Sequence, residues 1–394
     1  MDANSTTGCP RLLIDARSLA SNLRVLRRHL AAPTVQVIAV VKADAYGHDA
    51  KLVCQLLELI EEDDPFNKVD QYAVATIEEA ASLGDVSKPI MILRPVENVF
   101  LGRQRDALEY AIRRGWTLTL ASPAAADDVA RVALHLGERA NVQLMIDTGM
   151  VRCGCPAGQF DNLLERTLAH ASLKLVGVCT HFVNGEHAAD PVTNRQLRQF
   201  DGLVSNHPLL DGVPKHVANS GGILLTPRSH YDAVRPGLSL YGYDPTGRPS
   251  LDRPLTPVMK WTAPVLAIHD VAPGQGVGYN HTWTAQTPSK IAVIPVGYAD
   301  GYPRSAGNRA IALVNGQPCG VVGRVSMDAL TVDVTRVADA HVGDEVTLVD
   351  NDPTSPASLY GLCTASGMIP YEILTGVGAR VRRVPVGVEA EALA

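Results

Sequence analysis

The sequence lacks the features that mark a membrane protein or a nucleic-acid-binding protein. No apolar run approaches the ~18 residues that a membrane-spanning helix needs, and the opening residues MDANSTTGCP contain neither the basic nor the apolar part of a secretory signal peptide. Lysine and arginine form no block, and the formal net charge is -6. We therefore expect a cytoplasmic protein that contacts neither a membrane nor nucleic acid.

Two further absences narrow the class of protein. Seven cysteines are scattered from Cys9 to Cys363 without the spacing of a zinc site, and Cys153 and Cys155 are too close together for a usual zinc pair. We expect reduced thiols and no metal. The sequence also contains no G-x-G-x-x-G motif, which removes the main sequence argument for an open dinucleotide-binding sheet.

The stretch VQVIAVVKADAYGH combines a buried strand with a reactive amine. The run Val35–Val41 predicts a strand buried on both faces, and Lys42 stands at its end. Burial disfavours the ammonium form, so Lys42 could become a neutral amine that forms a Schiff base with an aldehyde. Tyr46 follows as a hydroxyl donor and Gly47 as a point of close backbone approach. A lysine that reaches past the strand end into solvent is the alternative.

Strand and helix patterns alternate through the first part of the chain. Helical patterns cover residues 15–30, where Ser18 is a candidate N-cap, and residues 49–60. Besides Val35–Val41, seven runs predict strands: Tyr72–Ala75, Pro89–Leu93, Trp116–Leu120, Val142–Ile146, Lys174–Cys179, His216–Ala218 and Asp232–Arg235. Eight such units in about 230 residues predict an α/β protein with a closed (β/α)8 TIM-type barrel, which we assign to residues 12–250.

Polar residues follow these strands, and in such barrels the carboxyl ends of the strands share one rim. Lys42, Arg152, His181 and Arg235 all come at or shortly after a strand end. The SGG sequence at 220–222 can begin a short helix whose amides point at an anion, so the rim predicts a phosphate-bearing ligand. Taken singly, His181 could instead be a hydrogen-bonded core histidine, and Arg152 a surface cation.

The hydrophobic pattern changes in the second part of the chain. The proline-rich residues 235–255 predict a linker, and beyond them apolar residues recur with a period of two. Asn315-Gly316 predicts a two-residue hairpin turn. Residues 255–394 should therefore form an all-β domain, with residues 1–11 as candidates to pack against it. The predicted strands are Val258–Asp270, Lys290–Val296, Ala310–Val314, Cys319–Gly323, Leu330–Val334 and Glu345–Val349.

Nine ordered segments carry a family resemblance: AVVKADAYGH, IDTGMVRCG, THF, ANS, VRPGLSLYG, VGYNHTW, IPVGYADGYPR, GRVSMD and PYEILTGVGARV. Over nearly the whole chain they resemble the alanine racemases, which are fold-type III enzymes dependent on pyridoxal 5'-phosphate. The resemblance implies interconversion of L- and D-alanine, with supply of D-alanine for peptidoglycan as the expected role. It also implies a head-to-tail homodimer with shared active sites, in which Tyr279, Met327 and Asp328 reach the cofactor of the neighbouring subunit.

The resemblance assigns a role to individual residues. Lys42 would form the Schiff base with the cofactor, and Arg235 would face its pyridine nitrogen. Arg152 would contact the phenolic oxygen of the cofactor and the substrate carboxylate, which the Met327 amide helps to fix. The phosphate would be held by Tyr46, Ser220, Gly237 and Tyr371. The other expected site residues are His181 and Asn219 at the cofactor, Tyr298 at the substrate, and Asp328 as a support.

A racemase removes a proton from one face of the substrate Cα and returns one to the other, so two acid/base groups must flank it. By the resemblance, Lys42 takes the proton of D-alanine and Tyr279 that of L-alanine. Lowering the pKa of a phenol by about three units takes roughly 4 kcal/mol, and we expect His181 with Arg152 to supply the positive charge. The permanent charge of Arg235 should keep the ring nitrogen unprotonated, which limits side reactions such as transamination.

Two residues depart from the pattern of the family. Met145 stands where many relatives have a lysine that becomes carbamylated and braces the site arginine. A thioether is only a weak acceptor, so we expect an anion, water or another carboxylate to orient Arg152, with some loss of rigidity. Asn280 replaces a commoner glycine and still tolerates a left-handed backbone.

Other functions stay open on this scaffold. Residue spacing does not show the volume of the substrate pocket, so a broader racemase that also accepts serine is the alternative. A non-catalytic pyridoxal-phosphate-binding protein would not need the long β domain that carries Tyr279. An amino-acid decarboxylase of the same barrel type would be expected to use a carboxylate where this chain has Arg235.

Overall fold

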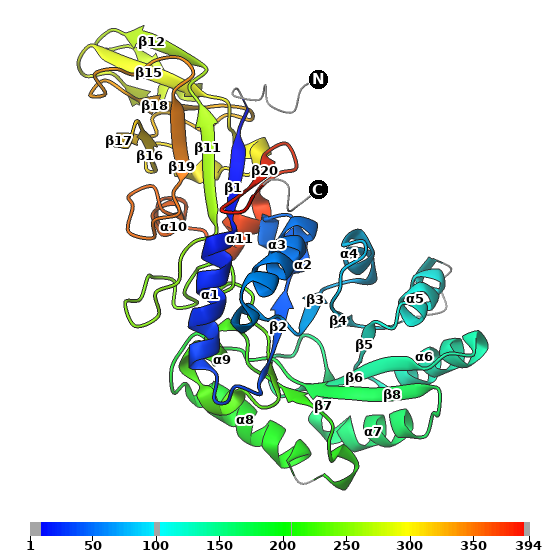
Figure 1. The fold of residues 1–394 in the computed structure, drawn as a ribbon. Coiled ribbons are helices and arrows are strands. Elements are labelled where there is room, and N and C mark those ends of the chain that lie inside the picture. The colour runs from blue at the N-terminus through cyan, green and yellow to red at the C-terminus, as the bar shows by residue number, and fades with distance from the viewer. Residues whose placement is uncertain (1–8, 98–102, 206, 390–394) are drawn as a thin grey trace.

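The N-terminal part of the protein is a closed parallel barrel. The computed structural model describes residues 9–97, 103–205 and 207–389. Eight strands pair in the order β2-β3-β4-β5-β6-β8-β9-β10, and β10 returns to β2 (Figure 1). The predicted TIM-type fold is confirmed, with strand ends shifted by a few residues. The strands are β2 (Gln36–Val40), β3 (Gln71–Val74), β4 (Ile90–Pro95), β5 (Thr117–Leu120), β6 (Ala140–Asp147), β8 (Leu173–Cys179), β9 (Lys215–His216) and β10 (Ala233–Val234), and β7 (Cys155–Pro156) adds to β6.

Helices connect the barrel strands and cover the outside of the barrel (Figure 1). Their ends carry the expected signals: in the 123–136 helix, Ser122 caps the first turn, Pro123 begins it and Gly137 ends it with a φ of 71°. The helices are α1 (Ala16–His29), α2 (Lys42–Gly47), α3 (Ala50–Asp63), α4 (Ile77–Ser82), α5 (Arg103–Arg113), α6 (Pro123–Leu136), α7 (Phe160–Leu168), α8 (Pro191–Val204) and α9 (Ser220–Leu225).

The first helix begins differently from our prediction. Asp15 caps α1, because its carboxylate accepts a hydrogen bond from the Arg17 amide at 2.9 Å. Ser18, the predicted cap, lies inside the helix and donates to the Asp15 carboxylate at 3.2 Å. Asp15 also ends a strand, β1 (Arg11–Asp15), which sequence periodicity did not reveal.

The C-terminal part is built on β-sheets, as predicted. Its larger sheet has the order β17-β16-β19-β11-β1-β20, so β1 from the start of the chain lies inside it. These strands are β11 (Met259–Pro264), β16 (Ile311–Val314), β17 (Gln317–Gly320), β19 (Glu345–Val349) and β20 (Arg382–Val386). A second sheet pairs β12 (Ala267–Val271), β15 (Ser289–Ile294) and β18 (Leu330–Asp333), and a ribbon pairs β13 (Gly276–Val277) with β14 (Trp283–Thr284). Two short helices, α10 (Leu359–Ser366) and α11 (Pro370–Gly376), complete this domain.

Two details of the C-terminal prediction can be compared with the structure. The hairpin turn is confirmed: Val314 pairs with Gln317, and the two residues between them, Asn315 and Gly316, both have positive φ. The single strand predicted over residues 258–270 is wrong, because it is two strands in different sheets. The break follows Pro264, which has no amide hydrogen to extend a ladder.

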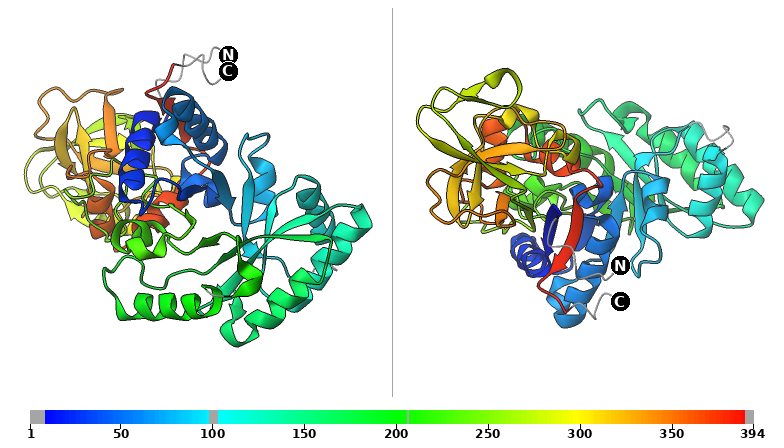
Figure 2. Two further views of the ribbon diagram at one scale, coloured as in Figure 1. Left: turned by 60° about the horizontal axis from the view of Figure 1, so that its bottom comes forward. Right: turned by 90° about the horizontal axis from the view of Figure 1, so that it is seen from above.

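The predicted linker is partly wrong as well. Tyr241 and Tyr243 are completely buried, and the Tyr241 hydroxyl donates to the Val40 carbonyl at 2.9 Å. Buried Asn22 of α1 donates to the Thr256 carbonyl at 2.8 Å and accepts from the same residue's amide. Residues 238–243 therefore belong to an apolar core that runs without a break from the barrel into the β domain. Figure 2 shows the two domains side by side.

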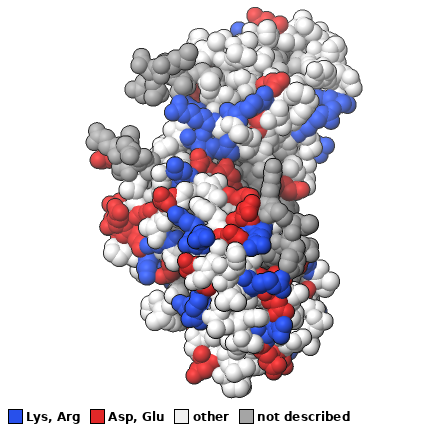
Figure 3. Space-filling view, turned by 90° about the vertical axis from the view of Figure 1, so that its right-hand side faces the viewer, with Lys and Arg blue, Asp and Glu red and all other residues white. Residues whose placement is uncertain are grey.

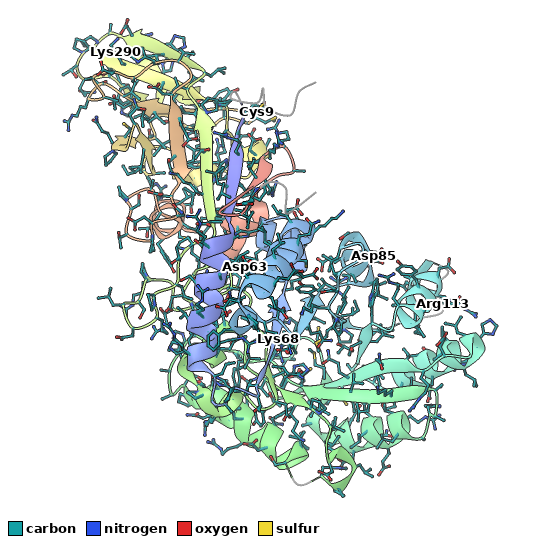
Figure 4. All side chains as sticks on the ribbon, viewed as in Figure 1. Cys9, Asp63, Lys68, Asp85, Arg113 and Lys290 are labelled. Carbon is teal, nitrogen blue, oxygen red and sulfur yellow. The ribbon has the colours of Figure 1, made fainter. Side chains whose placement is uncertain are left out.

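Charged side chains of both signs are spread over the surface (Figure 3). On the face drawn in Figure 3, acidic and basic groups are intermixed. Lys290, at the far tip of the β domain, pairs with Asp270 at 3.4 Å, and Asp85 on the outside of the barrel pairs with Arg114 at 2.9 Å (Figure 4). Such exposed pairs contribute about 0–1 kcal/mol. In the described part of the chain, every helix is too short or too polar to cross a membrane.

Candidate active site

Lys42 begins a left-handed turn at the carboxyl end of β2. Residues 43–46 have φ between 51° and 54°, a conformation that costs an L-residue about 1–2 kcal/mol. Backbone strain of this size persists only where neighbouring groups hold it. Buried His48 is one of these groups, because its Nδ1 donates to the carbonyls of Ala45 and Tyr46, both at 2.9 Å.

The C-terminal domain holds the other end of the turn. The Arg383 guanidinium of β20 donates to the Gly47 carbonyl at 3.0 and 2.9 Å, and also to the Val377 carbonyl at 2.9 Å. A Cβ atom at Gly47 would lie 2.1 Å from the carbonyl oxygen of Leu374 in α11. Only glycine therefore permits this contact between the turn and α11, which lies against α2.

The surroundings of Lys42 favour its neutral amine. Burial is the main cause that lowers the pKa of Lys42, and the positive charges of Arg152 and Arg235 lower it further. Glu79 acts in the opposite direction. This direction agrees with the predicted effect of burial on the strand-end lysine, and the role of Lys42 as the reactive amine stays a prediction.

Residues from three segments form a cradle in the same cavity as Lys42. Asn219 caps the short helix α9 by accepting from the Gly222 amide at 3.0 Å. The Ser220 hydroxyl accepts from the amides of Gly237 and Ser239, both at 3.1 Å, so its own hydrogen is free for another acceptor. A Cβ at Gly237 would lie 2.3 Å from the Tyr46 hydroxyl oxygen. The hydroxyl groups of Ser220 and Tyr46 thus lie at the predicted position of a phosphate.

Arg235 is buried and held in a fixed orientation. Its guanidinium donates to the carbonyls of Thr180, Val217 and His216 at 2.7, 3.0 and 2.9 Å. It also donates to His216 Nδ1, so that nitrogen accepts and His216 Nε2 carries the hydrogen that reaches Gln143 Oε1 at 2.8 Å. Burial and the charge of Arg235 hold the pKa of His216 well below its ordinary value, which keeps this histidine neutral. Arginine keeps its own charge even when buried.

His181 cannot supply the positive charge that we expected from it. Burial is the main cause that lowers the pKa of His181 to about 3, and Arg235, Arg152 and Lys42 lower it further. His181 is therefore neutral near pH 7, because its ring is buried and lies near the positive charges of Arg235 and Arg152. Of the pair proposed from the sequence, only Arg152 carries a charge.

One cavity of about 550 Å³ joins these groups. All nine residues that the sequence assigned to the cofactor line it: Lys42, Tyr46, Arg152, His181, Asn219, Ser220, Arg235, Gly237 and Tyr371. The sequence reasoning missed Arg94, which also lines the cavity near the end of β4. The rule that strand ends share one rim could have found it. Glu79 was missed too, and no sequence signal marks it.

Comparison with known proteins agrees with this geometry. The family model of the alanine racemase N-terminal domain matches residues 14–245, and that of the alanine racemase C-terminal domain matches residues 258–385. The chain belongs to the alanine racemase family. Alanine racemase from Sorangium cellulosum is 34% identical over 95% of this chain and 98% of its own. The biosynthetic alanine racemase of Pseudomonas aeruginosa is 35% identical over 94% and 97%.

Solved structures of the family share the whole fold. Alanine racemase from Streptomyces lavendulae superposes with a TM-score of 0.85 at 29% identity, covering 98% of this chain and 99% of that one. Alanine racemase from Bartonella henselae, a structure with covalently bound pyridoxal phosphate, gives 0.82 at 30% identity, covering 96% and 99%. The family fold thus extends over both domains of this chain.

Four residues that the family resemblance assigned to the site lie outside the cavity. They are Tyr279, Tyr298, Met327 and Asp328, all in the β domain. Tyr279 is 68% exposed and Met327 53% exposed. The Met327 carbonyl accepts from the Ala299 amide at 3.0 Å, and Asp328 pairs with Arg380 at 2.8 Å. The segments that carry Met327 and Asp328 are therefore held by contacts within the β domain, and none of the four residues lines the cavity of the same chain.

Met145 lines the cavity beside Arg152, as its place in β6 requires. Within the described residues, no hydrogen bond or ion pair holds the exposed Arg152 guanidinium. The prediction that an anion, water or another carboxylate orients Arg152 in place of a lysine at position 145 therefore stays open to test.

Proposed function

We propose that this protein is an alanine racemase that uses pyridoxal 5'-phosphate to interconvert L- and D-alanine. The observation that carries the proposal is the single cavity in which Lys42, with a lowered pKa, lies with a donor-lined cradle and a buried Arg235. Membership of the alanine racemase family supports alanine as the substrate. A broader serine racemase and a non-catalytic carrier are not favoured.

The residues of the cavity suit the proposed cofactor. Ser220 has both of its acceptor positions engaged by amides, so its hydroxyl hydrogen can point at a phosphate oxygen, and Tyr46 and Tyr371 add two more hydroxyls. Gly237 leaves room for this approach, because a side chain there would overlap the Tyr46 hydroxyl. When bound, pyridoxal phosphate would supply an aldehyde for Lys42 and an electron-withdrawing ring. Arg235 would be the group at the ring nitrogen, and it has no proton to give up.

We further propose a homodimer that completes each site. Within one chain Tyr279 is exposed and outside the cavity, so the second base would come from the β domain of a partner subunit. Lys42 would then accept the Cα proton from one face of alanine and Tyr279 from the other. Arg152 would bind the substrate carboxylate and help to lower the pKa of the partner's phenol, with neutral His181 available only as a hydrogen-bond partner. A cytoplasmic location and a role in peptidoglycan synthesis stay predictions.

A test of the activity uses the purified protein and chiral analysis. Incubation with L-alanine should produce D-alanine, and the reverse, while L-serine should react more slowly. Lys42→Ala should lose the absorbance of covalently bound pyridoxal phosphate together with activity. Tyr279→Phe should keep the absorbance and lose racemisation. A Lys42→Ala protein that keeps both properties would refute the proposal.

Mixing the two inactive variants tests the shared site. If Tyr279 serves the partner subunit, a heterodimer of one Lys42→Ala subunit and one Tyr279→Phe subunit has one intact site. Its other site carries both substitutions. Random reassociation would then restore about a quarter of the wild-type activity. If both bases came from one chain, mixing would restore nothing.

A further inference from the structure

We propose that Glu79 is a positioning residue that ties the Lys42 turn to the end of β3 through two backbone amides. This inference rests on the proposed role of Lys42 as the reactive amine. Glu79 belongs to α4 and is not among the residues that line the cavity. It would therefore act through Lys42 and without touching a ligand.

The geometry is that of a two-amide clamp. One carboxylate oxygen of Glu79 accepts from the Ala43 amide at 3.0 Å, and the other accepts from the Ala75 amide at 2.6 Å. Ala43 is the first left-handed residue after Lys42, and Ala75 directly follows β3. A single carboxylate thus joins the carboxyl ends of two neighbouring barrel strands. Hydrogen bonds to an ionised acceptor are the stronger kind, so this clamp suits a strained turn.

The side chain of Glu79 has the length and the starting point that the clamp requires. Thr76 caps α4 by accepting from the Glu79 amide at 3.2 Å, which fixes the backbone of Glu79 next to β3. Glu78, its neighbour in the first turn of α4, is exposed and makes no such contact. The pair offers two glutamates of the same helix, of which only one reaches the Lys42 turn.

The charge of Glu79 opposes that of the other groups around Lys42. Arg152 from the loop after β6 and Arg235 from the end of β10 face the amine as cations, and His181 faces it as a neutral ring. Both arginines lower the pKa of Lys42, whereas Glu79 raises it. Removing the Glu79 charge should therefore shift the titration of Lys42 to lower pH.

The test separates charge from reach with two variants and a matched control. Glu79→Gln keeps the length and removes the charge, Glu79→Asp keeps the charge and shortens the reach, and Glu78→Gln alters the exposed neighbour. The experiment uses the full chain after any bound pyridoxal phosphate has been removed. Acetic anhydride acylates the Lys42 amine only in its neutral form, so the pH dependence of acylation reports the titration of this amine. Peptide mass spectrometry measures the acylation. Hydrogen exchange of the segment around Ala43 reports the turn.

We expect Glu79→Gln to shift Lys42 acylation to lower pH and Glu79→Asp to shift it less. Both should increase hydrogen exchange around Ala43 at least tenfold, and Glu78→Gln should change neither quantity. If Glu79→Gln matches Glu78→Gln in both measurements while circular dichroism shows a folded chain, the inference is overturned. If Glu79→Gln does not fold, an unchanged exchange rate in folded Glu79→Asp overturns it.

The outcome is independent of the racemase assay. Acylation and exchange need neither alanine nor pyridoxal phosphate. A wild-type protein without racemase activity would refute the proposed function and leave the clamp open to measurement. Conversely, an active enzyme whose Glu79 variants behave like the control would refute only the clamp.

Discussion

Replacing Gly237 with alanine should disturb the predicted phosphate cradle through a clash with Tyr46. The added Cβ would lie 2.3 Å from the Tyr46 hydroxyl oxygen and 3.0 Å from its ring carbon Cζ. Tyr46 cannot easily move, because it is buried against Tyr241 with ring centroids 5.0 Å apart. Overpacking of this kind costs about 1–3 kcal/mol. At roughly 2–4 °C per kcal/mol for a domain of this size, the melting temperature should fall by several degrees.

A control and a rescue make this prediction specific. Gly202 lies in the interior of α8, and a Cβ added there would meet nothing within 4 Å, so Gly202→Ala should be neutral or stabilise the protein by about 0.5–1 kcal/mol. Removing the clashing oxygen with Tyr46→Phe should recover part of the loss caused by Gly237→Ala, because the two substitutions then interact.

Thermal denaturation and titration with pyridoxal phosphate measure the effects of these variants. In the Gly237→Ala protein, cofactor affinity should fall about tenfold or more, since each 1.4 kcal/mol corresponds to a factor of about ten. If Gly237→Ala melts and binds as Gly202→Ala does, or if Tyr46→Phe adds to the loss without any rescue, the reasoning about this contact is wrong.

Three further predictions concern other parts of the site. Burial lowers the pKa of His48 from 6.5 to about 4. As the pH falls from 6.5 to about 4, the unfolded chain therefore binds a proton before the folded chain does, and His48 should lower the unfolding free energy by about 1.4 kcal/mol per pH unit. In chemical denaturation His48→Gln should flatten this slope, and His135→Gln at an exposed histidine should not. Arg235→Lys keeps the positive charge but loses the planar set of donors. Spectroscopic titration should show that this variant binds pyridoxal phosphate about tenfold more weakly. Equal affinity would contradict the role of the guanidinium. Met145→Lys should change KM or kcat for alanine by altering what braces Arg152, and unchanged steady-state constants would count against that hypothesis.

The alternation of β-branched runs with helical patterns was enough to predict the barrel, because each buried strand and its helix are encoded locally. All eight barrel strands appear within a few residues of their predicted positions. The same logic failed where long-range packing decides. Residues 238–243 lie in a proline-rich stretch yet are buried, because Tyr241 packs into the core and its hydroxyl donates to the Val40 carbonyl. β1 pairs with β11 and β20, which are more than two hundred residues away, and no local period announces such a strand.

The sequence by itself determined which strand-end side chains line the cavity, because their order along eight strand ends places them on one rim. Lys42, Arg235 and the SGG sequence at 220–222 follow from that rule alone. Only the tertiary structure decided the charge state of His181 and the clamp by Glu79. Both depend on which groups from distant elements surround a buried atom, and the electrostatic field at that atom is a sum over neighbours in space that no stretch of sequence contains.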